Sequence, residues 1–161
     1  MQSTIVSKNL DLVTPALNNL LDIWLNEDLG RGDLTSVALR HAQGSAHWIA
    51  KQTGVFCGGK MIKHIFQRID QTVSINLLIK DGENFQIGQR LLELEGSANS
   101  LVAGERTSLN LAMHLSGIAT ATANLVSELE GTGVHLADTR KTTPGLRILE
   151  KYAVRCGGGI N

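Results

Sequence analysis

The stretch ADTRKTTPGLR, residues 137–147, decides the fold that the sequence predicts for the second half of the chain. The apolar run at 134–137 predicts a strand that leads into it, and Thr143-Pro144 predicts the start of a helix that the glycines at 157–159 end. Upstream, residues 105–129 have helical apolar spacing, with a break expected at Gly117. Helix, strand, loop and helix in this order are typical of the beginning of a parallel α/β barrel or sheet.

The first hundred residues have a different pattern. Thr14-Pro15 predicts the N-terminus of an amphipathic helix that ends at Gly30, and a second helix is indicated at 61–69. Short segments with alternating apolar residues indicate strands, at 46–50, 73–77, 85–87 and 92–94. Together these elements predict a small α+β unit.

Composition limits the possible functions. With 161 residues, 42% of them hydrophobic, the chain is long enough for one domain, or one and a part. Fifteen basic and fifteen acidic residues give no net charge, so we expect neither a nucleic acid nor a membrane as partner. Without a signal or membrane segment, a cytoplasmic protein is expected. Cys57 and Cys156 have no CxxC or zinc-ligand spacing and are expected to be reduced thiols.

Arg140 and Lys141 are the first candidate binding residues. They follow the predicted strand at its C-terminal end, where α/β barrels and open sheets bind their ligands. Arginine offers a planar fork and lysine a mobile point charge, so the pair suits a small ligand with more than one anionic group. Thr139 adds a hydroxyl donor. A solvated loop is the alternative, but two like charges beside a predicted helix N-terminus favour an anion between them.

Arg106, in GERTSLNLAMHLSG, is expected where a helix begins, again the unfavourable end for a cation. The alternatives are Glu105 as its partner or an ordinary surface ion pair, and the residues alone leave its role open. The last predicted helix has a basic stripe that is expected to be a solvated face, at Arg147, Lys151 and Arg155. The five histidines form no recognisable catalytic triad, and no catalytic residue is assigned.

The run ADTRKTTPGLRILEKYAVRCGGGIN closely resembles the quinolinate phosphoribosyltransferase family. LNEDLGRGDLTS and GERTSLNLAMHLSGIAT resemble the same family in the same order, so that the resemblance covers nearly the whole chain. It implies an α+β fold, with an N-terminal α/β-sandwich domain at 1–115 and the first, incomplete part of an α/β barrel at 116–161. It also implies a homodimer whose active sites take residues from both subunits.

The activity implied by this resemblance is phosphoribosyl transfer from phosphoribosyl pyrophosphate to quinolinate with Mg²⁺, giving nicotinate mononucleotide, CO₂ and pyrophosphate in NAD biosynthesis. Thr139, Arg140 and Lys141 match the family's quinolinate-binding loop, and Arg106 matches the arginine that the neighbouring subunit contributes. The family's His-Arg pair, and its later lysine and acidic residues for phosphoribosyl pyrophosphate and the metal, have no match in these residues. The chain is therefore expected to be an N-terminal portion that has no metal ligands, binds substrate weakly and is inactive alone.

Two alternatives stay open. One is a relative of this enzyme that is associated with molybdate transport and shares its scaffold. The other is a non-catalytic unit for folding or dimerisation, which an exposed half-barrel edge would favour. The intact TRKTTPGLR and GERTSLN motifs favour the quinolinate enzyme over the first alternative. Size-exclusion chromatography with a quinolinate titration would separate the second, since a pure assembly unit would dimerise without binding the diacid.

Overall fold

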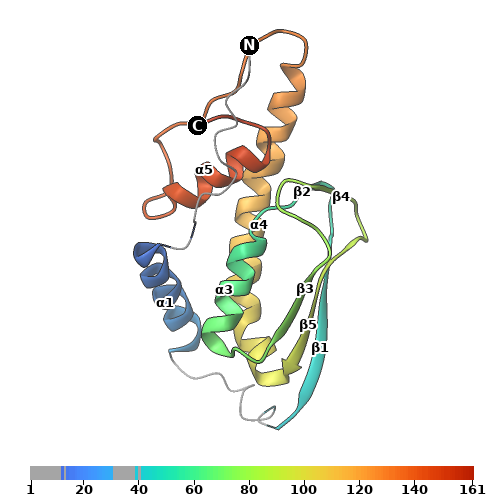
Figure 1. The fold of residues 1–161 in the computed structure, drawn as a ribbon, viewed down its shortest axis with the longest axis vertical. Helices are drawn as coiled ribbons and strands as arrows, with labels where there is room; N and C mark the ends of the chain where they lie inside the picture. The colour runs from blue at the N-terminus through green and yellow to red at the C-terminus, as the bar shows by residue number, and fades with distance from the viewer. Residues whose placement is uncertain (1–11, 13, 31–38, 40) are drawn as a thin grey trace.

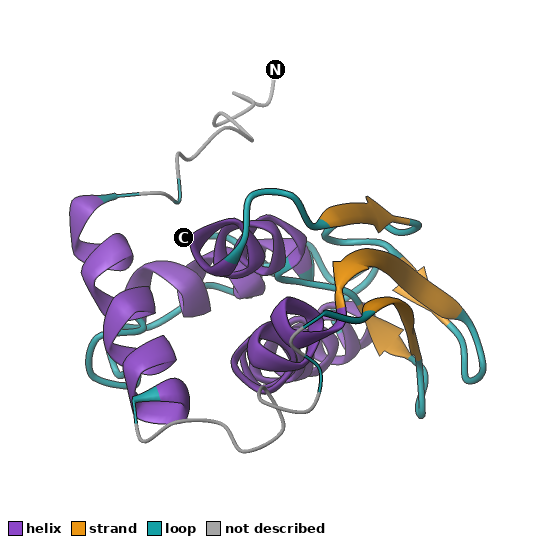
Figure 2. Ribbon diagram, turned by 90° about the horizontal axis from the view of Figure 1, so that it is seen from below, coloured by secondary structure: helices purple, strands orange, loops and turns teal. Residues whose placement is uncertain are grey.

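The structure is a computed structural model that describes residues 12, 14–30, 39 and 41–161. Within this part, helices pack against one side of a small antiparallel sheet in two layers (Figures 1 and 2). Most of the GRGDLTS segment, residues 31–36, lies outside the described residues. The class is mixed α+β, as predicted from the sequence.

The first helix, α1 (Pro15–Leu29), begins where the sequence predicted. The hydroxyl of Thr14 accepts a hydrogen bond from the backbone N–H of Leu17 at 3.2 Å, and Pro15 occupies the first helical turn, where it has no N–H to leave unpaired. The apolar stripe buries Leu17, Leu21 and Leu25. Gly30 caps the helix through its N–H, which donates to the Asn26 carbonyl.

The main sheet has three antiparallel strands in the order β1 (Gln43–Ile49), β5 (Arg90–Ser97) and β3 (Ser74–Leu77). Two further strands, β2 (Gly54–Val55) and β4 (Asn84–Phe85), form a separate short pair. Alternation along β5 buries Leu92 and Leu94, while Glu93 and Glu95 lie on the opposite face. The predicted strands are therefore confirmed, although the one expected at 85–87 is shorter and lies earlier.

Two predictions for the longest helix are wrong. α4 (Ala98–Glu128) is one continuous helix of 31 residues, so Arg106 lies in its third turn and Gly117 does not interrupt it. Gly117 is on the exposed side, and a glycine there costs only about 1 kcal/mol relative to alanine. Burial of the Leu111, Leu115 and Ala119 side of the helix offsets that cost.

α4 is the centre of the molecule because both core clusters include it. One cluster joins α4 to the sheet and to α3 (Gly59–Ile69), with Phe66, Leu92 and Leu101 among its members. The other joins α4 to α1, α3 and the last helix, α5 (Arg147–Cys156). In Figure 1 α4 runs the length of the molecule, with α1, α3 and α5 beside it.

The segment after α4 differs from its prediction in two details. Only Ala137 of the expected strand pairs, in a parallel bridge with Ile160, supported by hydrogen bonds from Asp138 N to Ile160 O (3.0 Å) and from Ile160 N to Leu136 O (2.9 Å). Residues 144–146 form a turn with Gly145 at φ 85°, so α5 begins at Arg147 and not at Pro144. The order of strand segment, helix and parallel partner is nevertheless that of a β-α-β unit.

The glycine run at 157–159 ends α5 as predicted. Gly157 also lies so close to α4 that a Cβ atom there would be 2.3 Å from the Ala119 carbonyl oxygen. Because such a distance is far inside van der Waals contact, only glycine lets the end of α5 pack on α4 in this way.

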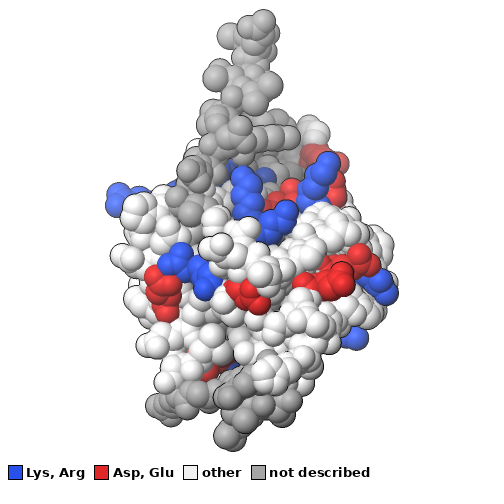
Figure 3. All heavy atoms as spheres, turned by 60° about the horizontal axis from the view of Figure 1, so that its bottom comes forward, with Lys and Arg blue, Asp and Glu red and all other residues white. Residues whose placement is uncertain are grey.

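Charges of both signs are mixed over the face drawn in Figure 3, in keeping with the neutral composition. In the part of the chain that the structure describes, no helix is long and apolar enough to cross a membrane.

Candidate functional site

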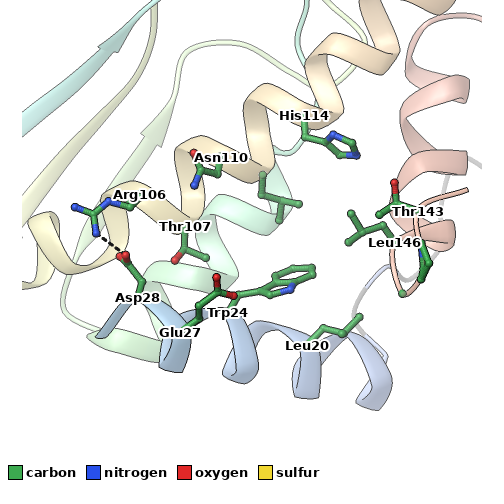
Figure 4. Close-up of a pocket in the computed structure, with 13 residues that line it drawn as sticks. Leu20, Trp24, Glu27, Asp28, Arg106, Thr107, Asn110, His114, Thr143 and Leu146 are labelled. Carbon is green, nitrogen blue, oxygen red and sulfur yellow. Dashed lines mark hydrogen bonds and ion pairs between the residues drawn. The ribbon is translucent and has the colours of Figure 1, made fainter. Parts of the chain in front are cut away.

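A cleft of about 510 Å³ lies between α1, α4 and the turn before α5 (Figure 4). Trp24 extends from α1 beneath α4, and His114 of α4 points toward the segment with Thr143 and Leu146. The lining includes both apolar and polar side chains of α1 and α4. The polar side chains of α4 that line the cleft are Arg106, Thr107, Asn110 and His114.

Arg106 lies at one end of the cleft. Its Nη1 atom donates a hydrogen bond of 2.5 Å to Asp28 Oδ1 on α1. The Arg106 side chain is 74% exposed, whereas that of Asp28 is only 18% exposed. The alternative of a surface ion pair is therefore confirmed, with Asp28 as the acid and not Glu105. The predicted place at a helix N-terminus is wrong, and the macrodipole of α4 gives no argument for a ligand here.

Glu150 contacts two residues that line the cleft, His114 and Thr143. Its Oε1 atom is 2.9 Å from His114 Nε2, and its Oε2 atom accepts a hydrogen bond from the Thr143 backbone N–H at 3.1 Å. Burial opposes ionisation of Glu150, but the hydrogen bonds from Thr143 and His114 outweigh it and hold its pKa below the ordinary value. Glu150 thus joins α4 to the segment that leads from the cationic loop into α5.

The cationic loop, residues 139–143, is shaped by the first turn of α5. Arg147 donates from Nε to Thr142 Oγ1 at 3.1 Å and from Nη2 to the Arg140 carbonyl at 3.4 Å. Thr139 Oγ1 accepts from the Lys141 backbone N–H at 3.1 Å, which closes a tight turn within the loop. Arg147 is exposed, as predicted for a solvated face, and its hydrogen bonds add a contact with the loop.

Arg140 and Lys141 are exposed, and among the described residues neither cationic side chain has a hydrogen-bonding or ionic partner. The loop has a fixed backbone and two adjacent, unneutralised charges, an arrangement that suits a ligand with two anionic groups. Arg106 lines the cleft, but Thr139, Arg140 and Lys141 do not. Within one chain the four predicted binding residues therefore do not share one pocket.

Asp138, next to this loop, was missed from the sequence. Its carboxylate, only 9% exposed, accepts hydrogen bonds from Lys151 Nζ of α5 and from Asn161 Nδ2. Lys151 is consequently not part of a solvated face, which corrects the second member of the predicted basic stripe. Arg155, the third member, lies 5.7 Å from the Tyr152 ring centre, in the range of a cation–π contact.

His114 and Glu150 were also not singled out. A signal for His114 was present, because Arg106, Asn110 and His114 recur at i, i+4 and i+8 and so lie along one face of a helix. No comparable signal exists for Glu150, because its partner His114 lies on α4 and its partner Thr143 lies in the loop before α5. Among the described residues, no group of three or more His, Cys, Asp or Glu side chains could hold a metal ion.

The long helix, the parallel bridge behind it and the cationic loop at that bridge define the class: an α+β protein whose second part begins a parallel α/β structure. Two family models match it. The model described as quinolinate phosphoribosyl transferase, N-terminal domain, matches residues 33–116, and the model of the C-terminal domain matches residues 118–161. The chain therefore belongs to the quinolinate phosphoribosyltransferase family.

Individual relatives agree with this assignment. The chain is 47% identical over 146 residues to a Bacillus subtilis (strain 168) protein named probable nicotinate-nucleotide pyrophosphorylase (carboxylating), covering 90% of this chain and 50% of the relative. It is 33% identical over 172 residues to a mitochondrial quinolinate phosphoribosyltransferase (decarboxylating) of Nicotiana tabacum, covering 99% of this chain and 48% of the relative. The chain thus spans about half the length of the curated relatives it matches.

Solved structures give the same answer for the fold. The crystal structure of NadC from Streptococcus pyogenes superposes with a TM-score of 0.88 at 39% identity, covering 96% of this chain and 55% of that one. The nicotinate-nucleotide pyrophosphorylase from Francisella tularensis also gives a TM-score of 0.88, at 34% identity, with 96% of this chain and 57% of that one covered.

Proposed function

We propose that this chain supplies the quinolinate-binding loop of a carboxylating nicotinate-nucleotide pyrophosphorylase, which transfers a phosphoribosyl group from phosphoribosyl pyrophosphate to quinolinate. The products are nicotinate mononucleotide, CO₂ and pyrophosphate, in the biosynthesis of NAD. The family membership supports the reaction. The observation that carries the role of the loop is the pair Arg140 and Lys141, exposed and without partners among the described residues on a backbone that α5 holds in place.

The chemistry of the substrate matches this loop. Quinolinate has two carboxylates on adjacent ring carbons, one of them beside the ring nitrogen. The Arg140 fork can bind one carboxylate through two parallel hydrogen bonds, and the Lys141 ammonium can neutralise the other. Such binding would hold the ring nitrogen in a fixed direction toward the ribosyl carbon, so that less orientational freedom is lost when the new C–N bond forms.

We also propose a cytoplasmic homodimer in which Arg106 of one protomer reaches the quinolinate site of its partner. Two observations support this arrangement. Arg106 is largely exposed at the end of the cleft, and Thr139, Arg140 and Lys141 of the same chain do not line that cleft. The bond to Asp28 would keep the Arg106 guanidinium oriented until a ligand carboxylate shares it.

Mg²⁺ is part of the proposed reaction, since a divalent cation would neutralise the pyrophosphate leaving group. The described residues do not fit a site for it, because none of their His, Cys, Asp and Glu side chains form a cluster of three or more that could hold a metal. The residues of this chain are therefore assigned only substrate binding and orientation.

Quinolinate titration tests the role of the loop. The Arg140→Ala variant is expected to bind quinolinate tenfold to a hundredfold more weakly, because it loses charge-assisted hydrogen bonds worth about 1.5–3 kcal/mol. Arg90→Ala is the matched control: Arg90 is exposed on the sheet and paired with Glu93, far from the loop, so affinity should not change. Isothermal titration calorimetry measures both, and equal affinities for Arg140→Ala and the unmodified protein would contradict the proposal.

A further inference from the structure

Cys57 and Cys156 are far apart in the sequence but adjacent in the structure. Cys57 follows β2 and lies just before α3, while Cys156 is the last residue of α5. Both are free thiols, and both belong to the packing of the same core cluster. They are also the only two cysteines of the sequence, so any thiol chemistry between them is unambiguous.

The carboxylate of Asp81 fixes the two cysteine-bearing elements relative to each other. Its Oδ1 atom accepts hydrogen bonds from the backbone N–H groups of Gly58 (2.9 Å) and Gly59 (2.8 Å), directly after Cys57. Its Oδ2 atom accepts a hydrogen bond of 2.7 Å from the hydroxyl of Tyr152, one helical turn before Cys156. One side chain thus holds both partners of the thiol pair in place.

Helix α4 provides a second brace on each side of the pair. Ser116 Oγ accepts from the Cys57 backbone N–H at 3.0 Å and donates to the Cys57 carbonyl at 3.2 Å. On the other side, the close approach of Gly157 to the Ala119 carbonyl fixes the end of α5. A disulfide needs its two sulfur atoms about 2.0 Å apart with a restricted torsion angle. Because both thiols pack in one core cluster between braced elements, we expect a small side-chain movement to bring them to that geometry.

The two thiols are not equivalent. Cys57 is fully buried, and the pKa of its thiol is raised because it donates a hydrogen bond to Cys156 and because it is removed from water. Cys156 is partly exposed, and the pKa of its thiol is lowered because it accepts that hydrogen bond, although burial and the Asp81 charge oppose the effect. Cys156, the less buried of the two, is therefore the one that we expect to react with a solute, and the buried Cys57 thiol is expected to react only with its neighbour.

We propose that Cys57 and Cys156 form an oxidation site at which a peroxide converts the thiol pair into an intrachain disulfide. The Cys156 thiolate attacks one peroxide oxygen, the O–O bond breaks, and hydroxide leaves, which makes Cys156 a sulfenic acid. The Cys57 sulfur then attacks the Cys156 sulfur. The S–S bond forms, the S–O bond breaks, and the departing oxygen takes the Cys57 proton to leave as water. A dithiol reductant reverses the reaction by thiol–disulfide exchange.

The disulfide would join two parts of the molecule that matter for the binding loop. Cys57 belongs to the β2–α3 segment, whereas α5 carries Arg147 and Glu150, which shape residues 139–143. A covalent link between them closes a long loop of chain and restricts the unfolded state. The oxidised protein is therefore expected to melt several degrees higher than the reduced one. The site is independent of the proposed activity.

Peptide mapping after peroxide treatment tests the proposal. The reduced protein is treated with hydrogen peroxide, its remaining thiols are blocked with N-ethylmaleimide, and it is digested with trypsin. The expected product is the peptide of residues 52–60 joined to the peptide that begins at Cys156, and dithiothreitol should separate the two. An interchain disulfide, seen as a reducible dimer in a denaturing gel, would overturn the proposal, as would recovery of Cys57 with its thiol blocked after Cys156 has been oxidised.

Two variants separate the roles of the thiols. In Cys57→Ser, Cys156 should stop at the sulfenic acid and be captured by dimedone. In Cys156→Ser, Cys57 should stay reduced. If Cys156 is oxidised to the sulfinic acid at the same rate with and without Cys57, then Cys57 does not act as the second thiol and the proposal fails. The peptide map of the unmodified protein decides the matter even if a variant does not fold.

Discussion

At the scale of single residues, the candidate site depends on two side chains of α5 that hold the binding loop in place. Glu150 accepts from Thr143 and contacts His114, and Arg147 bonds to Thr142 and to the Arg140 carbonyl. These contacts give Arg140 and Lys141 a fixed backbone while leaving their charged ends exposed. Reducing the flexibility of a loop before binding lowers the entropy that is lost on binding.

The pH dependence of stability tests the role of Glu150. Because its pKa is lowered in the folded state, its ionised form adds stability above its ordinary pKa of about 4.5, and this stability is lost as the pH falls through the lower folded value. Glu150→Gln removes this contribution. The melting temperature of the variant should be below that of the unmodified protein at pH 7, and the difference should shrink toward pH 3.

Other carboxylates, those of Asp22, Asp70 and Glu93, also have lowered pKa values, so both proteins will lose stability in acid. The informative quantity is therefore the difference between the two melting temperatures at each pH. A difference that stays the same from pH 7 to pH 3 would show that Glu150 acts through packing and not through its charge.

The residues predicted from the sequence and those found in the structure differ for a physical reason. Thr139, Arg140 and Lys141 were predicted because adjacent cations after an apolar run form a local pattern. Asp138 and Glu150 were missed because their partners, Lys151 and His114, are brought to them by the packing of helices. Local sequence shows which groups are available, whereas partner choice depends on tertiary contacts.

At the scale of elements, close contacts of α4 decide where its neighbours lie. Ser116 and Thr120 on α4 accept hydrogen bonds from the backbone N–H groups of Cys57 (3.0 Å) and Val55 (2.9 Å), which satisfies a segment that pairs with β4 over only two residues. A helix broken at Gly117 could not present both hydroxyls along one face. The continuity of α4 thus positions β2 and α5 together. The sequence pattern did not predict this continuity, because Gly117 indicated a break in the helix.

Two glycine-to-alanine substitutions test this packing, and we expect them to change the free energy of unfolding in opposite directions. Gly157→Ala places a Cβ atom 2.3 Å from the Ala119 carbonyl, so α5 must move away from α4, and a loss of about 1–3 kcal/mol of unfolding free energy is expected. Gly117→Ala meets nothing within 4 Å on an exposed helical turn, and a gain of about 0.5–1 kcal/mol is expected. Urea denaturation measures both.

The pair distinguishes steric contact from a general effect of adding a methyl group. If Gly157→Ala is as stable as the unmodified protein, the end of α5 does not pack on α4 as described. If Gly117→Ala is destabilised, the helix is not continuous at that position.

At the scale of the whole molecule, sequence patterns predicted the mixed α+β class, most strands and the helix ends formed by Thr14-Pro15, Gly30 and Gly157. These patterns gave the wrong structure where the same local sequence fits two different structures. A glycine inside an apolar stripe fits both a break and a continuous helix, and Thr143-Pro144 fits both a helix start and a turn. Burial of Leu149 and Ala153 against α4 sets the start of α5, and that contact is not local.

The proposed sharing of the site between protomers gives the last prediction. If Arg106 serves the partner's cationic loop, then Arg106→Ala and Arg140→Ala protomers can complement each other. In a mixed dimer one site loses both arginines and the other keeps both. After equal mixing and exchange, half of the dimers are mixed, so about a quarter of the quinolinate sites should regain the affinity of the unmodified protein. Titration of the mixture measures this fraction. A mixture with no site of unmodified affinity would mean that Arg106 and Arg140 act within the same chain. Half of the sites with unmodified affinity, together with full affinity of Arg106→Ala alone, would mean that Arg106 has no part in binding.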